Sequence, residues 1–164
     1  MTIISASEND AALIRDLAIA TWPDTFIDII SRKQIDYMLE LLYSVDSLNE
    51  QMKNGHHFIL AKDDNEVVGF ASYELNYKNE PKTKLHKIYI LPFVQNEGVG
   101  TALINFIKQE AHKHNNPTLT LNVNRRNKAV LYYKKQDFEI VKEEDIDIGS
   151  GFLMEDFVME KSLV

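Results

Sequence analysis

The residues best placed to do chemistry lie in a glycine-rich turn, Gln95-Asn96-Glu97-Gly98-Val99-Gly100-Thr101. Apolar residues recur after this turn at the spacing of one helix face, so the turn is predicted to open a helix. The first amides of a helix lack backbone partners, and the helix dipole adds partial positive charge there. Such a turn can bind phosphate oxygens, and glycine lets a ligand approach the backbone closely. A plain helix start without a ligand remains the alternative.

The residues before this turn are typical of a buried strand. Residues 88–91 are mostly apolar or β-branched, and Pro92 should end the strand because it cannot donate to a ladder. Gly100 is followed by Thr101, without the Lys-Ser/Thr pair of a P-loop, so a nucleoside-triphosphate site of that kind is not expected.

Length and composition limit the remaining possibilities. The 164 residues predict one domain over 1–164. The chain has no cysteine, and His112-Lys113-His114 lacks a fitting third ligand, so no metal is expected. The net charge of -7 disfavours nucleic acid as a partner and mildly favours a cationic substrate. Neither a signal peptide nor a membrane-spanning run is evident, so a cytoplasmic protein with no membrane partner is expected.

Predicted strands and helices follow one another in the order β, α, α(α), β, β, β, α, β, α, β, β. The first helix should end at Trp22-Pro23, because the residue before a proline is displaced from helical geometry. Capping boxes beginning at Ser31 and Ser47 predict two short helices within residues 31–54. Residues 76–84 are predicted as a loop and residues 138–141 as a strand. The pattern favours an α/β (α+β) fold: a mixed, mostly antiparallel central sheet of about seven strands with helices on both faces.

Two motifs in this order resemble a known family. Residues 95–100 resemble the Q/R-x-x-G-x-G/A signature of the GNAT superfamily of N-acetyltransferases, and residues 126–138 resemble its second signature, N-x-x-A-x-x-x-Y-x-K-x-G-F. Arg126 stands at the asparagine position of that motif, and Asp137, which tolerates left-handed backbone, stands at the glycine position. The resemblance covers essentially the whole chain. Within the superfamily, the chain is most similar to bacterial spermidine/spermine N-acetyltransferases of the PaiA type.

The resemblance implies that acetyl-CoA is the co-substrate. In the family, amides of the opening turn bind the pyrophosphate, and the strand before it pairs through its backbone with the pantetheine arm. By position, the implied cofactor-binding residues are Ile88, Tyr89, Ile90, Gln95, Asn96, Glu97, Gly98, Val99, Gly100, Thr101, Asn122, Asn127, Tyr133 and Lys135.

Two side chains are candidates for proton transfer. Tyr133 holds the family's tyrosine position, where a phenol can donate a proton or hydrogen bond to the departing thiolate. His86 lies where related enzymes often carry a glutamate, and an imidazole there could accept the proton of the amine directly or through water. A tyrosine that only packs on the sheet, and a water chain without a dedicated base, are the alternatives.

The acceptor is expected to be a small primary amine such as a polyamine. An aromatic pocket suits an aliphatic cation, and its candidate residues are Trp22, Thr25, Phe26 and Tyr37, although core packing would explain Trp22 equally well. Acetylation of a protein N-terminus or lysine is one alternative. A non-catalytic acyl-CoA-binding sensor domain is another. An exposed final strand could pair two copies of the chain into a homodimer.

Overall fold

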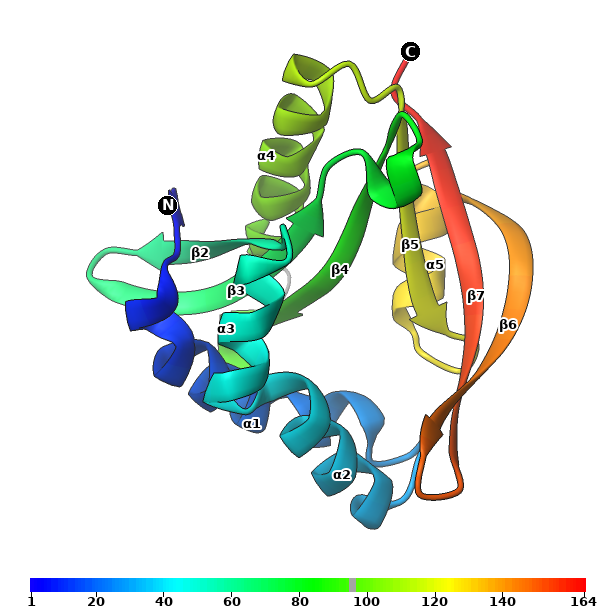
Figure 1. The fold of residues 1–164 in the computed structure, drawn as a ribbon. Coiled ribbons are helices and arrows are strands. Elements are labelled where there is room, and N and C mark those ends of the chain that lie inside the picture. The colour runs from blue at the N-terminus through cyan, green and yellow to red at the C-terminus, as the bar shows by residue number, and fades with distance from the viewer. Residues whose placement is uncertain (95–96) are drawn as a thin grey trace.

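A computed structural model describes residues 1–94 and 97–164, and its centre is a seven-stranded sheet of order β1-β2-β3-β4-β5-β7-β6 (Figure 1). The strands are β1 Thr2–Ser5, β2 His57–Asp63, β3 Glu66–Glu74, β4 Lys82–Ile90, β5 Thr118–Asn124, β6 Glu139–Gly149 and β7 Phe152–Ser162. The α-helices are α1 Ala11–Phe26, α2 Arg32–Tyr43, α3 Val45–Lys53, α4 Val99–Lys113 and α5 Ala129–Lys135. Within the described ranges β4 and β5 pair in parallel and the other neighbouring strands pair antiparallel, so the predicted fold class is confirmed.

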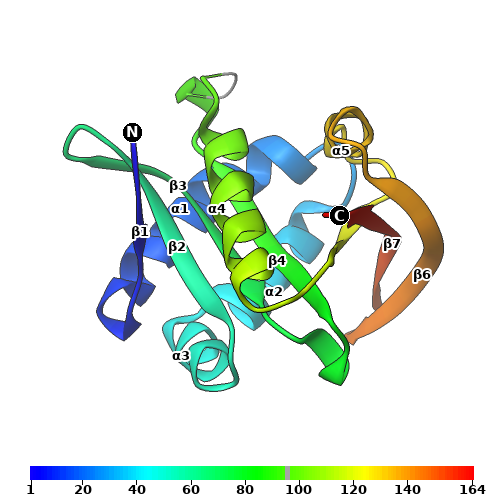
Figure 2. The same cartoon turned by 90° about the horizontal axis from the view of Figure 1, so that it is seen from above.

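Helices cover both faces of the sheet (Figure 2). Side chains alternate along β2, so that Phe58 and Leu60 join a core with α1, α2 and α3. Ile59 and Ala61 point the other way and join a second core with α4. The two cores therefore lie on opposite faces of the sheet. In the described part of the chain, none of the helices is long and apolar enough to cross a bilayer.

The sheet divides between β4 and β5. Their pairing begins at Lys82 with Thr118 and ends at Leu85 with Leu121, although β4 continues to Ile90 and β5 to Asn124. Beyond the last pair the two strands diverge (Figure 1). The ladder between β4 and β5 therefore stops at Leu85, and the two strands separate there, as the family resemblance implies.

A β-bulge lies at the point of divergence. Ser72 of β3 opposes Lys87, whereas the next residue, Tyr73, opposes Leu85, so His86 is the extra residue of β4. A bulge of this kind re-aims the side chains that follow it. The side chains of β4 before and after His86 therefore do not follow one continuous alternation between the two faces of the sheet.

The prediction that α1 ends at Trp22-Pro23 is wrong. The helix continues through Pro23 to Phe26, and the amide of Ile27 donates to the Pro23 carbonyl at 2.9 Å. Trp22 is 3% exposed and Phe26 is 7% exposed, with their rings 4.5 Å apart. Burial of these two rings offsets the helix hydrogen bond that proline removes.

Three other boundaries differ from the predictions. Ser44, and not Ser47, caps α3, because its hydroxyl accepts from the Ser47 amide at 3.1 Å. The predicted loop 76–84 is shorter, since β4 already begins at Lys82. The β6 strand extends to Gly149, well beyond the predicted 138–141, because pairing with β7 outweighs the low strand propensity of its acidic residues. Asp137 has the left-handed φ of 67° that its motif position requires.

Candidate functional site

A cavity of about 910 Å³ lies where β4 and β5 diverge. Leu85 to Ile90 form one wall and Leu121 to Asn124 the facing wall. The end of α1, the α1–α2 loop, one side of α2, the start of α4, the β5–α5 loop, part of α5 and part of β7 also line it. The cavity therefore joins the glycine-rich turn, the diverging end of β4 and the helices on the opposite face of the sheet.

The glycine-rich turn opens α4 as predicted. Gly98 is the N-cap of α4 with a left-handed φ of 81°, and its carbonyl accepts the first helical bond, from Ala102 at 3.0 Å. The amides before Ala102 are those that a helix leaves unpaired. A Cβ at Gly100 would lie 3.2 Å from Ile90 Cδ1 and 3.8 Å from the Tyr132 hydroxyl, so this position has little room for a side chain. Glu97 is exposed here, and the predicted residues Gln95 and Asn96 lie outside the described residues.

The two tyrosines of α5 both line the cavity but have different neighbours. The Tyr132 hydroxyl lies 3.2 Å from Thr101 Oγ1, beside the start of α4. Tyr133 is 6% exposed and packs edge-on against Phe138, with ring centroids 5.5 Å apart. Burial raises the pKa of Tyr133, so its phenol keeps its proton as a donor requires.

The strand residues Ile88, Tyr89 and Ile90 combine core side chains with a backbone that borders the cavity. Ile88 and Ile90 pack against the core on the α4 side. Tyr89 packs on the other face, with its ring 5.6 Å from that of Trp22. Core packing of these side chains fixes the position of the strand along the cavity wall.

His86 lies in a cluster with Glu74 and His56. Its Nε2 is 2.9 Å from Glu74 Oε1, and His56 Nε2 is 3.4 Å from the same oxygen. The two imidazoles stack with centroids 4.1 Å apart and planes 10° apart. Among the described residues, these three have potential metal-ligand atoms within 4.8 Å of one another, so they are a histidine–carboxylate cluster that the sequence did not indicate.

Burial determines the charge of this region. Desolvation first, and then nearby cations, lower the pKa of His56 to about 4 and that of His86 to about 2. Desolvation also lowers the pKa of Lys87 to about 8, and the Lys87 ammonium sits 4.9 Å from the centre of the Tyr43 ring. Both histidines are therefore neutral at neutral pH.

A polar wall faces this cluster across the divergence. Asn122 of β5 is its centre: the Lys84 ammonium donates to its oxygen, and its amide donates to Glu144 at 3.1 Å and to Asp156 at 3.2 Å. Asp156 lines the cavity and is only 4% exposed, and burial raises its pKa. The predicted cofactor residue Asn122 thus holds two carboxylates in place.

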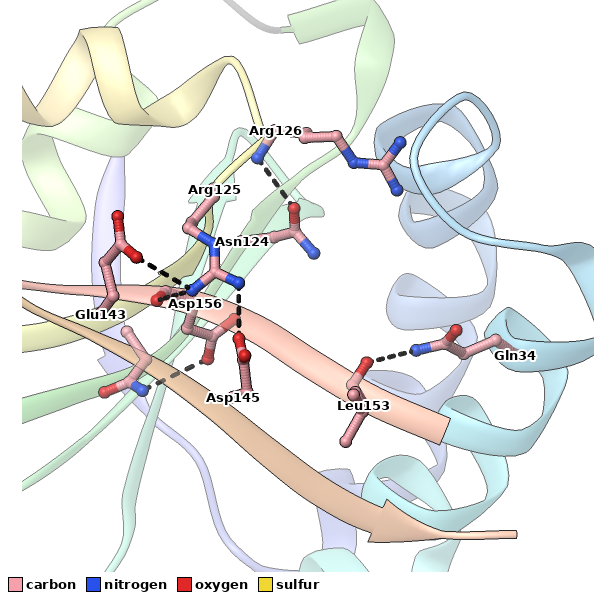
Figure 3. Close-up of polar contacts among 9 residues, drawn as sticks. Gln34, Asn124, Arg125, Arg126, Glu143, Asp145, Leu153 and Asp156 are labelled. Carbon is pink, nitrogen blue, oxygen red and sulfur yellow. Dashed lines mark hydrogen bonds and ion pairs between the residues drawn. The ribbon is translucent and has the colours of Figure 1, made fainter. Parts of the chain in front are cut away.

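Side-chain bonds tie this wall to the rest of the molecule (Figure 3). Arg125 donates to the Asp156 carbonyl at 3.2 Å and pairs with Asp145 of β6 at 2.5 Å. Gln34 of α2 donates to the Leu153 carbonyl at 2.8 Å. The Arg126 guanidinium donates a hydrogen bond to the Ile29 carbonyl. This bond links the β5–α5 loop to the α1–α2 loop beside the cavity.

The remaining predicted residues divide into two groups. Trp22, Thr25, Phe26 and Asn127 line the cavity. The Asn127 side chain also accepts from the Ala129 amide at 2.9 Å, at the start of α5. Tyr37 and Lys135 lie outside that lining: the Tyr37 hydroxyl donates to the Ile148 carbonyl at 2.6 Å, and Lys135 is exposed on α5.

The buried neutral histidines predict acid sensitivity of the fold. In the unfolded chain a histidine titrates near pH 6.5. With its pKa lowered in the fold, the unfolded state binds protons first, so stability is lost as the pH falls from about 6.5 towards 4. Urea unfolding should show a loss of about 2 kcal/mol for each of the two histidines, about 4 kcal/mol in all, between pH 7 and pH 5. The double variant His56→Gln/His86→Gln should flatten this slope, whereas exposed His112→Gln should keep it; an unchanged slope in the double variant would contradict the assignment.

The chain is similar to known proteins in sequence and in fold. Residues 27–160 match the family model described as an acetyltransferase (GNAT) domain. The PaiA N-acetyltransferase of Thermoplasma acidophilum, solved in complex with coenzyme A, has a TM-score of 0.79 at 23% identity over 99% of each chain. A GCN5-related N-acetyltransferase of Rhodopseudomonas palustris has a TM-score of 0.83 at 20% identity, over 99% of this chain and 95% of the other. A ribosomal-protein-alanine N-acetyltransferase of Brucella melitensis has a TM-score of 0.66 at 19% identity, over 99% of this chain and all of the other.

Proposed function

Because the chain belongs to the GNAT acetyltransferase family, we propose that it transfers the acetyl group of acetyl-CoA directly to the primary amine of a small cationic acceptor. Family membership makes it an acyltransferase, and the same membership weighs against a non-catalytic sensor domain. The observation that carries the proposal is that the start of α4, the diverging end of β4 and Tyr133 line the same cavity. One acetyltransferase domain over residues 1–164 is part of the proposal.

The residues at the start of α4 fit coenzyme A. Gly98 and Gly100 have no side chain that could cover the unpaired amides. A Cβ at Gly100 would have little room, so a glycine at this position leaves the amides accessible to a ligand. The pyrophosphate would lie at these amides, and the pantetheine arm would run along β4 towards His86. The PaiA N-acetyltransferase of similar fold was solved in complex with coenzyme A, which supports acetyl-CoA as the co-substrate.

The reaction forms an N–C bond and breaks the C–S bond of the thioester. The neutral amine attacks the acetyl carbonyl, and its proton passes to His86, which holds it only transiently because burial lowers the pKa of the imidazole. The departing thiolate receives a proton from the Tyr133 phenol, which its raised pKa keeps protonated until that step. Solvent then carries a proton from His86 back to Tyr133, so the net products are the N-acetylated amine and coenzyme A thiol.

The acceptor would bind opposite coenzyme A, on the side of α1 and β7. Asp156 is a buried carboxylate in the cavity wall, and Asn122 is its side-chain partner in the described structure. A buried carboxylate is stabilised by a nearby cation. An acceptor with a second ammonium group would supply that cation, which favours a polyamine over a monoamine.

Replacement of Asp156 should weaken acceptor binding selectively. Asp156→Asn keeps the size of the side chain and removes its charge, so the KM for a diamine or polyamine should rise about 10- to 100-fold, as for loss of a desolvated charge pair. The KM for acetyl-CoA should stay the same. Glu139→Gln, an exposed carboxylate-to-amide change on the neighbouring strand, is the matched control and should change neither constant. Equal KM values for the polyamine in Asp156→Asn and wild type would remove Asp156 from acceptor binding.

An acceptor panel tests the function as a whole. Acetyl-CoA consumption should be measured with polyamines, monoamines, amino acids, aminoglycosides and short peptides. The proposal expects the highest kcat/KM for polyamines. A preference for peptides would instead support protein acetylation, the activity named for the Brucella melitensis neighbour.

A further inference from the structure

We propose that Glu74 is the positioning residue for His86, fixing which imidazole nitrogen carries the proton so that the other can accept the proton of the amine. This inference rests on the proposed function for the identity of the proton donor. The position of the proton on the imidazole, in contrast, is inferred from the contact between the His86 and Glu74 side chains. Glu74 itself contributes nothing to the cavity lining and acts through His86.

The bulge in β4 creates this contact. His86 is the extra residue between the pairs Tyr73–Leu85 and Ser72–Lys87, so its side chain is not committed to a regular cross-strand position. Glu74 is the last residue of β3 and pairs with Lys84, two residues before His86. The bulge therefore brings the imidazole Nε2 within 2.9 Å of the carboxylate.

The chemistry of the pair determines the tautomer. An ionised carboxylate only accepts hydrogen bonds, so the nitrogen that faces it must carry a proton. A neutral His86 then has its proton on Nε2 and a free lone pair on Nδ1. In the described structure Nε2 has Glu74 as its partner and His86 lines the cavity, so Nδ1 is the proton acceptor available to a substrate.

The charges around His86 give the carboxylate a second role. His56 stacks on the imidazole from the α3–β2 connection, and Tyr77 meets it edge-on at 5.8 Å. The ammonium groups of Lys84 and Lys87, on the same strand, disfavour the imidazolium. Glu74 is a negative neighbour in contact with His86, so it would offset part of this cost when a proton reaches the imidazole during the reaction.

A bound cation is a weaker explanation for the same cluster. The lone pair of an imidazole nitrogen lies in the plane of its ring. The planes of His56 and His86 are only 10° apart and stacked, so their Nε2 lone pairs do not converge on one metal position. His86 Nε2 is instead hydrogen-bonded to Glu74 Oε1 at 2.9 Å, and His56 Nε2 lies farther from the same oxygen, at 3.4 Å.

Nitrogen-15 NMR of the imidazoles tests the tautomer directly in the full-length protein at pH 7.5. The His86 signals are assigned by their loss in His86→Gln. In wild type, Nε2 should have the chemical shift of a protonated nitrogen and Nδ1 that of an unprotonated one. A proton on Nδ1 in wild type would overturn the proposal. This measurement needs no acceptor, so it stays informative if the panel of amines gives no activity.

Kinetics with two variants test the consequence for the reaction. Glu74→Ala should lower kcat about 100-fold with little change in either KM, and should abolish the preference for the Nε2 proton. Glu74→Gln keeps an acceptor oxygen, so it should restore the tautomer while kcat stays below that of wild type, because the negative charge is missing. Glu66→Ala, an exposed change at the other end of β3, is the control and should behave as wild type.

The outcomes separate the two proposals. An active wild type with wild-type kcat in a folded Glu74→Ala variant would overturn the role of Glu74 and leave the acetyltransferase proposal intact. A wild type without activity towards any amine, but with the predicted His86 tautomer, would instead contradict the proposed function and leave the Glu74 contact standing.

Discussion

Replacement of Gly100 by Trp is expected to abolish acetyl-CoA binding, with the Kd rising at least about 100-fold. Even a Cβ at this position would lie 3.2 Å from Ile90 Cδ1 and 3.8 Å from the Tyr132 hydroxyl. An indole must therefore project from the start of α4 into the space above its unpaired amides, where the pyrophosphate would bind. Isothermal titration calorimetry with acetyl-CoA and with coenzyme A measures the loss.

Two further variants separate binding from folding. Gly100→Ala adds only a Cβ, which would lie 3.2 Å from Ile90 Cδ1, so it should weaken acetyl-CoA binding by less than the Trp variant does. Asn105→Trp places the same bulky ring on an exposed position of α4 and should bind as wild type. A Gly100→Trp protein that is folded and retains wild-type affinity would show that the pyrophosphate does not bind at this turn.

Replacement of Tyr133 by Phe is expected to lower kcat about 100-fold, at the scale of a lost general acid. Tyr133 is buried and its raised pKa keeps the phenol protonated, so its hydroxyl can serve the leaving thiolate. The ring of Phe would keep the packing against Phe138. The Kd for acetyl-CoA should therefore change by no more than about twofold, because the lost contact forms mainly as the thiolate leaves.

The control for this variant removes a different buried hydroxyl. Tyr73 is 5% exposed and stacks on His57 at 5.1 Å, away from the large cavity. Tyr73→Phe should retain wild-type kcat. If Tyr133→Phe also retained it, or if acetyl-CoA affinity fell in parallel with kcat, Tyr133 would not be the proton donor.

Local motifs explain why parts of the site were predictable. The start of α4 is encoded by adjacent residues, and both Gly98 and Asp137 have the left-handed backbone that their motif positions require. Tyr133 was found for the same reason, since a short motif sets its place on α5. In such segments, sequence spacing translates directly into spatial arrangement.

The remaining site residues depend on strand pairing and could not be found locally. Asp156 reaches the cavity because β7 pairs with β5 and brings it beside Asn122. Glu74 meets His86 only because a bulge displaces the register of β4. A single sequence carries no signal for such registers. The wrong end predicted for α1 has a similar origin, because the burial of Phe26 is a tertiary contact.

The measurement that tests the central claim most directly is the stoichiometry of a complete reaction. Purified wild-type protein is incubated with acetyl-CoA and a polyamine, free thiol is titrated, and the amine is analysed by mass spectrometry. The proposal predicts one N-acetyl group on the amine for each coenzyme A thiol released, at a rate that Tyr133→Phe lowers. Thiol release no faster than in the absence of protein, for every amine and peptide tested and despite bound acetyl-CoA, would contradict it.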